Sequence, residues 1–208
     1  MSIESDLKKD GIKIISKLDT LVVNNIARNI SRKIVATFPE LNFNETDLFI
    51  KLARIDMYTA TMPDGMAEAN YFYKNSSIYF NNKIDFTDLE EFAIHECIHH
   101  LQEIKTGKNK LLRMGLCSFN ALSPIGMGIN EAAVQLATAK MIGIEPDFVK
   151  YYGIELKSSS PSFLCILIMF LFCQNFHASI TSESGIFKFL AIELLLNLGL
   201  ELGSHACL

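Results

Sequence analysis

Residues 87–106, TDLEEFAIHECIHHLQEIKT, are the most informative stretch of the chain. Thr87 and Glu90 form a capping-box pattern, in which the threonine hydroxyl accepts from the third amide of a helix and the glutamate reaches back to the threonine amide. The pattern predicts a helix that begins at Thr87 and runs to about Thr106, where Gly107 ends it.

Within this predicted helix, residues 95–99 read His-Glu-Cys-Ile-His and match the pattern HExxH. Because residues four apart lie on one face of a helix, the imidazoles of His95 and His99 can reach the same ion. Zinc accepts imidazole nitrogen readily and takes about four ligands. Glu96 lies beside that face, where it can accept a proton from water whose pKa the metal lowers. The motif therefore predicts two ligands of a Zn²⁺ ion and a general base.

A third protein ligand has to come from elsewhere in the chain. The metzincin pattern would place glycine at position 102 and histidine at position 105, but the residues there are Gln102 and Lys105, which excludes that pattern. The other common solution is a glutamate on a later helix, and the stretch GINEAAVQL at residues 128–136 offers Glu131. An ordinary first-turn glutamate, favoured by the helix dipole, is the alternative interpretation of this residue.

HExxH followed by Asn-Glu-Ala at the start of a helix resembles the gluzincin, or thermolysin-like, clan of zinc metallopeptidases. The resemblance covers residues 92–102 and 126–136, and it implies a zincin-like fold and a peptide or protein substrate. The ligands that it implies are His95, His99 and Glu131, with Glu96 as the base. In that clan an aspartate one turn after the ligand glutamate orients a ligand histidine, whereas this chain has Gln135 there.

Other polar residues near the motif are weaker candidates. Metallopeptidases of this type use a tyrosine or histidine to stabilise the oxyanion, and Tyr151, Tyr152 and His177 all remain open for that role. His100 lies about 100° around the helix from the preceding ligand and should miss the metal. Glu103 could touch the rim of the site.

The remaining sequence completes an α+β fold. Helices are expected over residues 20–38, 45–54 and 130–143, and strands over residues 55–62, 69–73 and 78–81, the last two as a hairpin. A loop is expected between residues 107 and 130. These elements predict a zincin-like arrangement, with a small mixed or antiparallel sheet packed on the HExxH helix and a mainly helical C-terminal half. By analogy, the strand at residues 78–81 is the sheet edge on which substrate pairs, facing the Glu131 helix across a cleft.

The last quarter of the chain is unusually apolar. We expect a zincin-like catalytic domain over residues 1–160 and an apolar helical segment over residues 161–208, packed on the same domain. The unbroken apolar run at residues 163–173 is shorter than the roughly 20 residues of a membrane span. A membrane-associated protease, with residues 163–176 inserted as a helix, is therefore the less favoured alternative.

Composition narrows the class of protein further. Half of the residues are hydrophobic, 20% are charged and the net charge is −4, which is typical of a globular protein. No block of lysine and arginine is present, so a nucleic-acid partner is not expected. The five cysteines form no CxxC pair and the N-terminus lacks an apolar signal region, which predicts reduced thiols in the cytoplasm. Cys97 is expected to be a small buried residue without a catalytic role.

The leading hypothesis is therefore a cytoplasmic, zinc-dependent metallopeptidase that hydrolyses peptide bonds. A catalytically inactive zincin-like domain, acting as a binding module, is the second hypothesis. The sequence predicts neither the cleavage specificity nor the oligomeric state.

Overall fold

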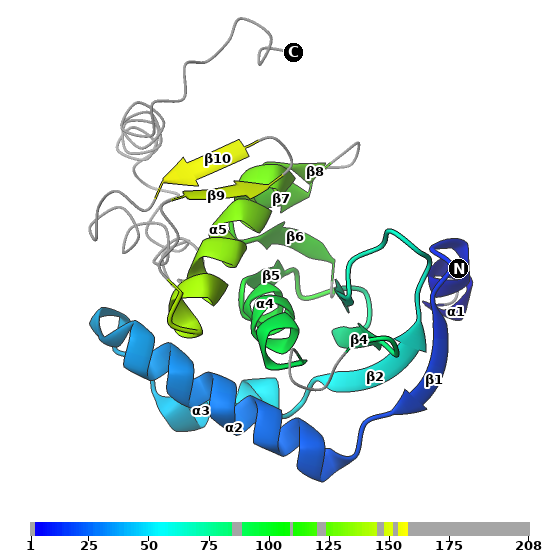
Figure 1. The fold of residues 1–208 in the computed structure, drawn as a ribbon, viewed down its shortest axis with the longest axis horizontal. Helices are drawn as coiled ribbons and strands as arrows, with labels where there is room; N and C mark the ends of the chain where they lie inside the picture. The colour runs from blue at the N-terminus through cyan, green and yellow to red at the C-terminus, as the bar shows by residue number, and fades with distance from the viewer. Residues whose placement is uncertain are drawn as a thin grey trace, which may run out of the picture.

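The computed structural model describes residues 3–84, 89–108, 110–119, 124–144, 148–151 and 154–157, with the backbone alone for the last two ranges. Helices and strands are mixed along the chain, which confirms the α+β class. The helices are α1 (Ile3–Lys9), α2 (Thr20–Thr37), α3 (Glu45–Leu52), α4 (Leu89–Leu101) and α5 (Met127–Met141), with a short 3-10 turn η1 (Pro39–Leu41). In Figure 1, α4 lies at the centre, with α2 and α3 below it and α5 above it. The helix that carries the HExxH motif is thus surrounded by other elements.

The first sheet has four strands in the order β1-β2-β4-β3. Their bounds are β1 (Lys13–Lys17), β2 (Asp56–Thr61), β3 (Ala69–Phe72) and β4 (Ser77–Asn81). β2 and β4 run parallel, whereas the outer pairs β1–β2 and β3–β4 are antiparallel. The sheet is therefore mixed, and β1 and β3 form its two edges.

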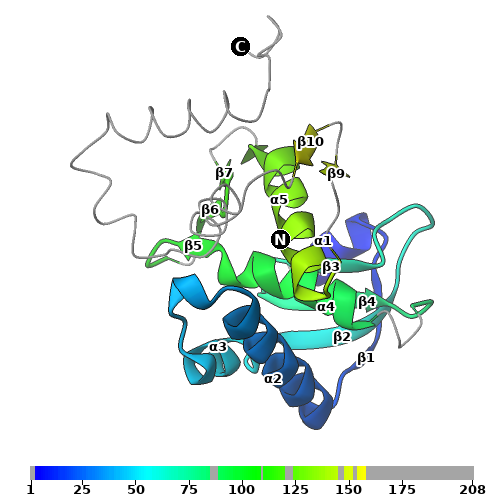
Figure 2. The same cartoon turned by 60° about the vertical axis from the view of Figure 1, so that its left-hand side comes forward.

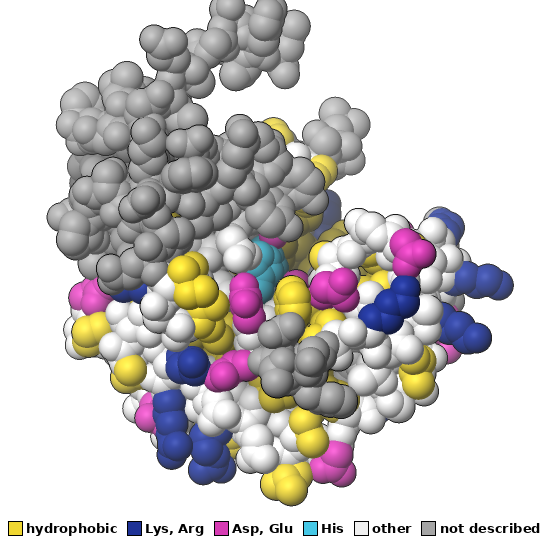
Figure 3. All heavy atoms as spheres, in the orientation of Figure 1, with side chains coloured by type: hydrophobic (Ala, Val, Ile, Leu, Met, Phe, Trp, Pro, Cys, Tyr) yellow, Lys and Arg dark blue, Asp and Glu magenta, His cyan; other side chains and the backbone are white. Residues whose placement is uncertain are grey.

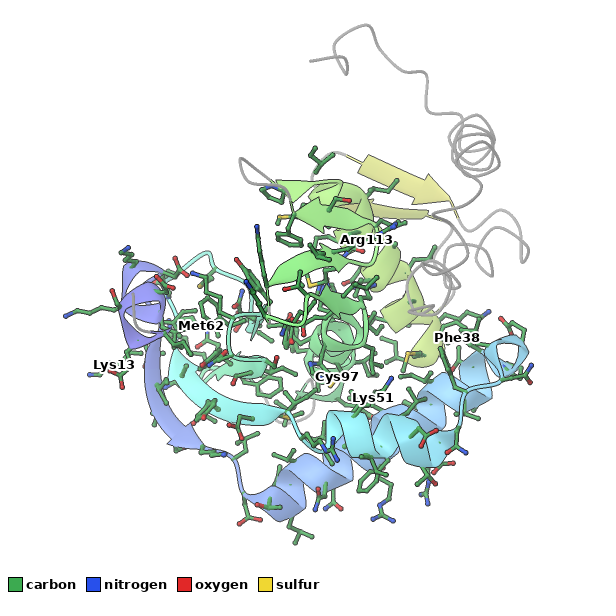
Figure 4. All side chains as sticks on the ribbon, turned by 180° about the vertical axis from the view of Figure 1, so that it is seen from behind. Lys13, Phe38, Lys51, Met62, Cys97 and Arg113 are labelled. Carbon is green, nitrogen blue, oxygen red and sulfur yellow. The ribbon has the colours of Figure 1, made fainter. Side chains whose placement is uncertain are left out.

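The two faces of this sheet bury different cores. Met57, Ile78 and Phe80 belong to the main core, which also includes apolar residues of α2, α3, α4 and α5. Figure 2 shows α4 between α2 and α5 on that side of the sheet. The opposite face packs against α1, and Met62, labelled in Figure 4, belongs to this smaller core with Tyr79. The alternation of β4 residues between the two cores follows from the two-residue period of a strand.

Helices α2 and α3 confirm the local sequence signals. Helix α2 covers the expected range to within one residue, and α3 ends two residues before the expected position. The Asn44 side chain accepts a hydrogen bond from the backbone N–H of Asp47 at 3.1 Å and so caps α3. Asp19 caps α2 in the same way by accepting from Leu21 at 2.7 Å. The hairpin of β3 and β4 is also confirmed.

The prediction that residues 78–81 form the edge of the sheet is wrong. Strand β4 lies between β2 and β3, and all of its residues are buried. The parallel pairing of β2 with β4 pushes the other hairpin strand, β3, to the edge next to α4. A hairpin pattern identifies two strands, but it does not indicate which of them meets the rest of the sheet.

The segment after α4 differs from the expected loop. It contains a second, antiparallel sheet in the order β5-β6-β7-β8, made of β5 (Glu103–Lys105), β6 (Leu111–Met114), β7 (Cys117–Phe119) and β8 (Pro124–Ile125). A two-stranded hairpin of β9 (Phe148–Tyr151) and β10 (Ile154–Lys157) follows α5. Among the described residues after α4, α5 is the one helix, and the rest of the predicted helical half lies outside the described residues.

Both helices of the predicted site have shifted ends. Helix α4 ends at Leu101 instead of near Thr106, because the chain turns there to enter β5. Helix α5 begins at Met127, three residues before the expected start. Its C-terminal end is as predicted: Gly143 adopts a φ of 79°, and its N–H donates to the carbonyl of Lys140.

Several predictions fall outside the described residues. They include the capping box at Thr87 and the apolar segment at residues 161–208. In the part of the chain that is described, no helix combines the length and apolar character needed to cross a membrane.

Candidate metal centre

Three side chains from two helices converge at one point. His95 and His99 project from the same face of α4, and Glu131 projects from the second turn of α5. The Nε2 atoms of both histidines lie 3.2 Å from Oε2 of Glu131 and 3.1 Å from each other. The three residues are the group, among those described, whose ligand atoms could hold a metal ion. The residues predicted as ligands are thus brought together.

The protonation states of His95 and Glu131 favour the binding of a cation between them. The side-chain oxygen of Gln135 can only accept, so His95 donates its Nδ1–H to it at 3.2 Å and keeps a lone pair on Nε2. Burial alone would raise the pKa of Glu131, but His95 and His99, when protonated at Nε2, lower it to about 2 through hydrogen bonds and positive charge. A cation in the place of those protons would favour the ionised carboxylate in the same way. An ionised carboxylate and an imidazole lone pair therefore point at the same position, which is the arrangement that a metal ion requires.

The position of Glu131 in α5 does not fit that of a first-turn glutamate favoured by the helix dipole. Because α5 begins at Met127, Glu131 lies beyond the first turn, where the dipole effect has fallen off. Its side chain keeps only 16% of its surface exposed and contacts both histidines.

The site is open on one side of the molecule. The side chain of His95 is 13% exposed, whereas that of His99 is only 5% exposed. Figure 3 shows a histidine at the bottom of a hollow, with acidic side chains on either side of it. Solvent therefore reaches the group mainly at His95 and Glu131, which are 13% and 16% exposed.

Glu96, the predicted base, lies next to this group and is almost fully buried, with 8% of its surface exposed. Burial raises the pKa of its carboxyl to about 7, and the charge of Glu131 also raises it. His95 and a hydrogen bond from the backbone N–H of Tyr71 act in the opposite direction. The carboxyl is thus held between the metal-binding group and the edge strand β3.

Tyr71 connects β3 to α4 through both its backbone and its side chain. Tyr71 is opposite Ile78 in the β3–β4 register, whereas Asn81 donates its N–H to the carbonyl of Glu68. Because hydrogen-bonded pairs alternate in an antiparallel ladder, the Tyr71 N–H points away from β4, toward Glu96. The Tyr71 hydroxyl lies 2.9 Å from Nδ1 of His100. Sequence reasoning missed this residue, and no motif marked it.

Among the described side chains, the weaker candidates for site residues do not belong to the group formed by His95, His99 and Glu131. His100 is outside the metal-binding group, as predicted, and burial lowers its pKa to about 4. Glu103 is also outside the group and forms an ion pair with Lys105 at 2.6 Å. Tyr151 lies in β9, where only the backbone is described.

Of the other two oxyanion candidates, Tyr152 and His177 both lie outside the described residues. No role in oxyanion stabilisation is therefore assigned to any of the three.

The cysteines near the site are buried. Cys97, labelled in Figure 4, is completely buried on α4, and burial raises the pKa of its thiol. Cys117 on β7 is also buried, and its pKa is raised by burial and by the charge of Glu131. Both thiols are protonated at neutral pH, in keeping with the expectation that Cys97 is a packing residue.

Family models, curated proteins and solved structures were compared with this chain, and none matches it. The case for a metal centre therefore rests on the convergence of His95, His99 and Glu131.

Proposed function

We propose that this chain is a zinc-dependent metallopeptidase of the gluzincin type. The observation that carries the proposal is the meeting of His95, His99 and Glu131 at one point, with the buried carboxyl of Glu96 beside them. Two imidazoles and a carboxylate are the ligand set of thermolysin-like zinc sites.

The spacing of the ligand atoms supports zinc. Zinc–nitrogen and zinc–oxygen distances are about 2.0–2.2 Å, so two ligand atoms of a tetrahedral site lie about 3.3–3.6 Å apart, a few tenths of an ångström more than in this structure. The three separations between His95, His99 and Glu131 are 3.1–3.2 Å. Zinc held by these residues would supply a Lewis acid that polarises a carbonyl and lowers the pKa of water.

Glu96 is the residue that moves the proton in this proposal. Its carboxylate accepts a proton from the attacking water and then donates it to the leaving amine of the cleaved peptide bond. The hydrogen bond from the Tyr71 N–H holds the carboxylate in place, and the apolar surroundings keep bulk water away from it.

The edge strand β3 is the proposed docking strand for the peptide. In its register with β4, Ala69 occupies the same type of position as Tyr71, so its N–H and C=O point away from β4. An extended peptide could pair with these groups and extend the sheet. Since the Tyr71 N–H is engaged by Glu96, the pairing would fall at Ala69. Only 2% of Ala69 is exposed, so a peptide would have to displace the groups that cover this residue.

The test combines metal analysis with one matched pair of variants. The purified full chain should contain about one equivalent of zinc and cleave members of a peptide library. Glu96→Gln should keep the zinc and lose at least about 99% of turnover, because the proton acceptor is gone. Glu90→Gln makes the same change on the same helix, where the exposed residue pairs with Lys33, and should keep full activity. Peptidase activity retained in Glu96→Gln would refute the mechanism.

A metal-binding domain without peptidase activity is the second candidate function. It is favoured by the neutral partner of His95 and by Nδ1 of His99, which has no hydrogen-bond partner among the described residues. Stoichiometric zinc without cleavage of any library peptide would select this function.

A further inference from the structure

A buried cluster of amide groups joins the two helices that carry the metal ligands. Gln102 follows the last residue of α4, and Asn130 immediately precedes Glu131 in α5. The Nδ2 of Asn130 donates to Oε1 of Gln102 at 3.2 Å. Both residues are almost completely buried, with 0% and 2% of their surface exposed for Asn130 and Gln102. This bridge lies three residues after His99 on one helix and one residue before Glu131 on the other.

The turn between β6 and β7 completes the cluster. The N–H of Leu116 donates to Oδ1 of Asn130 at 2.8 Å, and the N–H of Gly115 donates to the backbone carbonyl of Gln102 at 3.3 Å. Three separate elements therefore meet at two amide side chains. The side chain of Asn130 thus bonds to both other elements: its oxygen accepts from the turn, and its amide nitrogen donates to Gln102 at the end of α4.

Gly115 shows how tightly the turn is packed on this bridge. It has a φ of 55°, and a Cβ atom there would overlap with Oδ1 of Asn130 and lie 2.8 Å from Cδ of Gln102. The turn can approach the amides so closely only because position 115 lacks a side chain.

We propose that Gln102 and Asn130 are positioning residues that fix the distance between the α4 histidines and the α5 glutamate. The inference rests on the proposed metal centre, and it extends that centre by naming what holds its two halves in register. The ligands come from different helices, so a small shift of one helix would misplace Glu131 relative to His95 and His99. A hydrogen-bonded bridge beside the ligands prevents this shift, and it does so before any metal binds.

The inference predicts that breaking the bridge weakens zinc binding even under conditions in which the variant remains folded. Gln102→Met and Asn130→Ala each break the bridge, and Met retains most of the glutamine volume. We expect both variants to raise the zinc dissociation constant by about tenfold, the lower end of the effect of residues that support metal ligands. The measurement is competition with a chromophoric chelator at a temperature where circular dichroism shows the variant to be folded. If Asn130→Ala does not fold, Gln102→Met carries the test.

A variant that is destabilised elsewhere separates positioning from general stability. Leu52 is completely buried in α3, which contributes no residue to the amide bridge or to the metal-binding group. Leu52→Ala should therefore weaken the fold without changing zinc affinity by more than about twofold. The visible absorption spectrum of Co²⁺, bound in place of zinc, should change in the bridge variants and stay constant in Leu52→Ala.

The possible outcomes distinguish this inference from the proposed function. Wild-type zinc affinity in both bridge variants would overturn the inference, as would an equal loss of affinity in Leu52→Ala. Zinc binding by the wild type without peptide cleavage would refute the peptidase proposal and leave the positioning role intact. A wild-type chain that binds no zinc would refute the metal centre and the inference together.

Discussion

At the scale of single residues, the partner of His95 should set how strongly the proposed centre binds a metal. Gln135 accepts from Nδ1 of His95 at 3.2 Å, which fixes the tautomer with a lone pair on Nε2. A carboxylate in that place would fix the same tautomer and would also make the imidazole more basic. Hydrogen-bond contacts connect four side chains here, those of His95, His99, Glu131 and Gln135. Because Gln135 is neutral, the carboxylate of Glu131 carries the single negative charge among these four.

The first prediction follows from that difference in charge. Gln135→Glu should lower the zinc dissociation constant by about tenfold, because the carboxylate strengthens the basicity of the ligand. Gln135→Leu should raise it by about tenfold or more, since the orientation of the imidazole is lost as well. Chelator competition measures both values. An unchanged dissociation constant in Gln135→Glu would contradict the role assigned to this side chain.

At the scale of elements, predictions succeeded where the signal was local. Helix α3 was predicted from the Asn44 cap and the helical period, because both signals depend on residues within one or two turns. The predicted end of α4 was wrong. The helical pattern in the sequence continues to Gly107, but the chain leaves the helix at Gln102. The backbone carbonyl of Gln102 accepts from Gly115, a contact from another element that no local pattern reveals.

The C-terminal end of α5 allows a prediction at this scale. Gly143 has a φ of 79°, which a residue with a side chain rarely adopts, although a Cβ there would meet nothing within 4 Å. Gly143→Ala should therefore lower the free energy of unfolding by about 1–2 kcal/mol through backbone strain alone. Gly107→Ala is the matched control, because that glycine has no positive φ and also has open space around it.

Urea denaturation monitored by circular dichroism measures both glycine variants. Gly107→Ala should be neutral or more stable by up to about 1 kcal/mol, because alanine restricts the unfolded chain. Equal stabilities for the two variants would show that the left-handed end of α5 does not constrain the fold.

At the scale of the whole molecule, the site exists because two helices pack in one core. The i and i+4 spacing correctly predicted that His95 and His99 lie on one face of one helix. The place of Glu131 beside them depends on how α4 packs against α5, and only the resemblance to gluzincins indicated it. The contacts of Tyr71 with Glu96 and of Asn130 with Gln102 could not be predicted from the sequence. Each contact joins two elements that are far apart in the chain, and no short segment indicates that they are neighbours.

Removing the metal should therefore affect the stability of the entire fold. The three side chains come together in the native state and are dispersed when the chain unfolds, so zinc bound by them would stabilise the native state by RT ln(1 + [Zn]/Kd). At a free zinc concentration 100-fold above Kd the gain is about 2.7 kcal/mol. For a chain of this size we expect a melting temperature about 5–10 °C higher with zinc than after chelation.

Glu131→Gln separates this effect from zinc bound elsewhere on the surface. The variant keeps the shape of the side chain but loses the charge that the two histidines hold ionised, so most of the zinc-dependent shift should disappear. Glu90→Gln should keep the shift in full, because the exposed carboxylate of Glu90 lies outside the metal-binding group. Differential scanning calorimetry at several zinc concentrations gives all three values. A shift of equal size in Glu131→Gln would mean that zinc stabilises the chain at another place, and the convergence of α4 and α5 would then have to be explained without a metal.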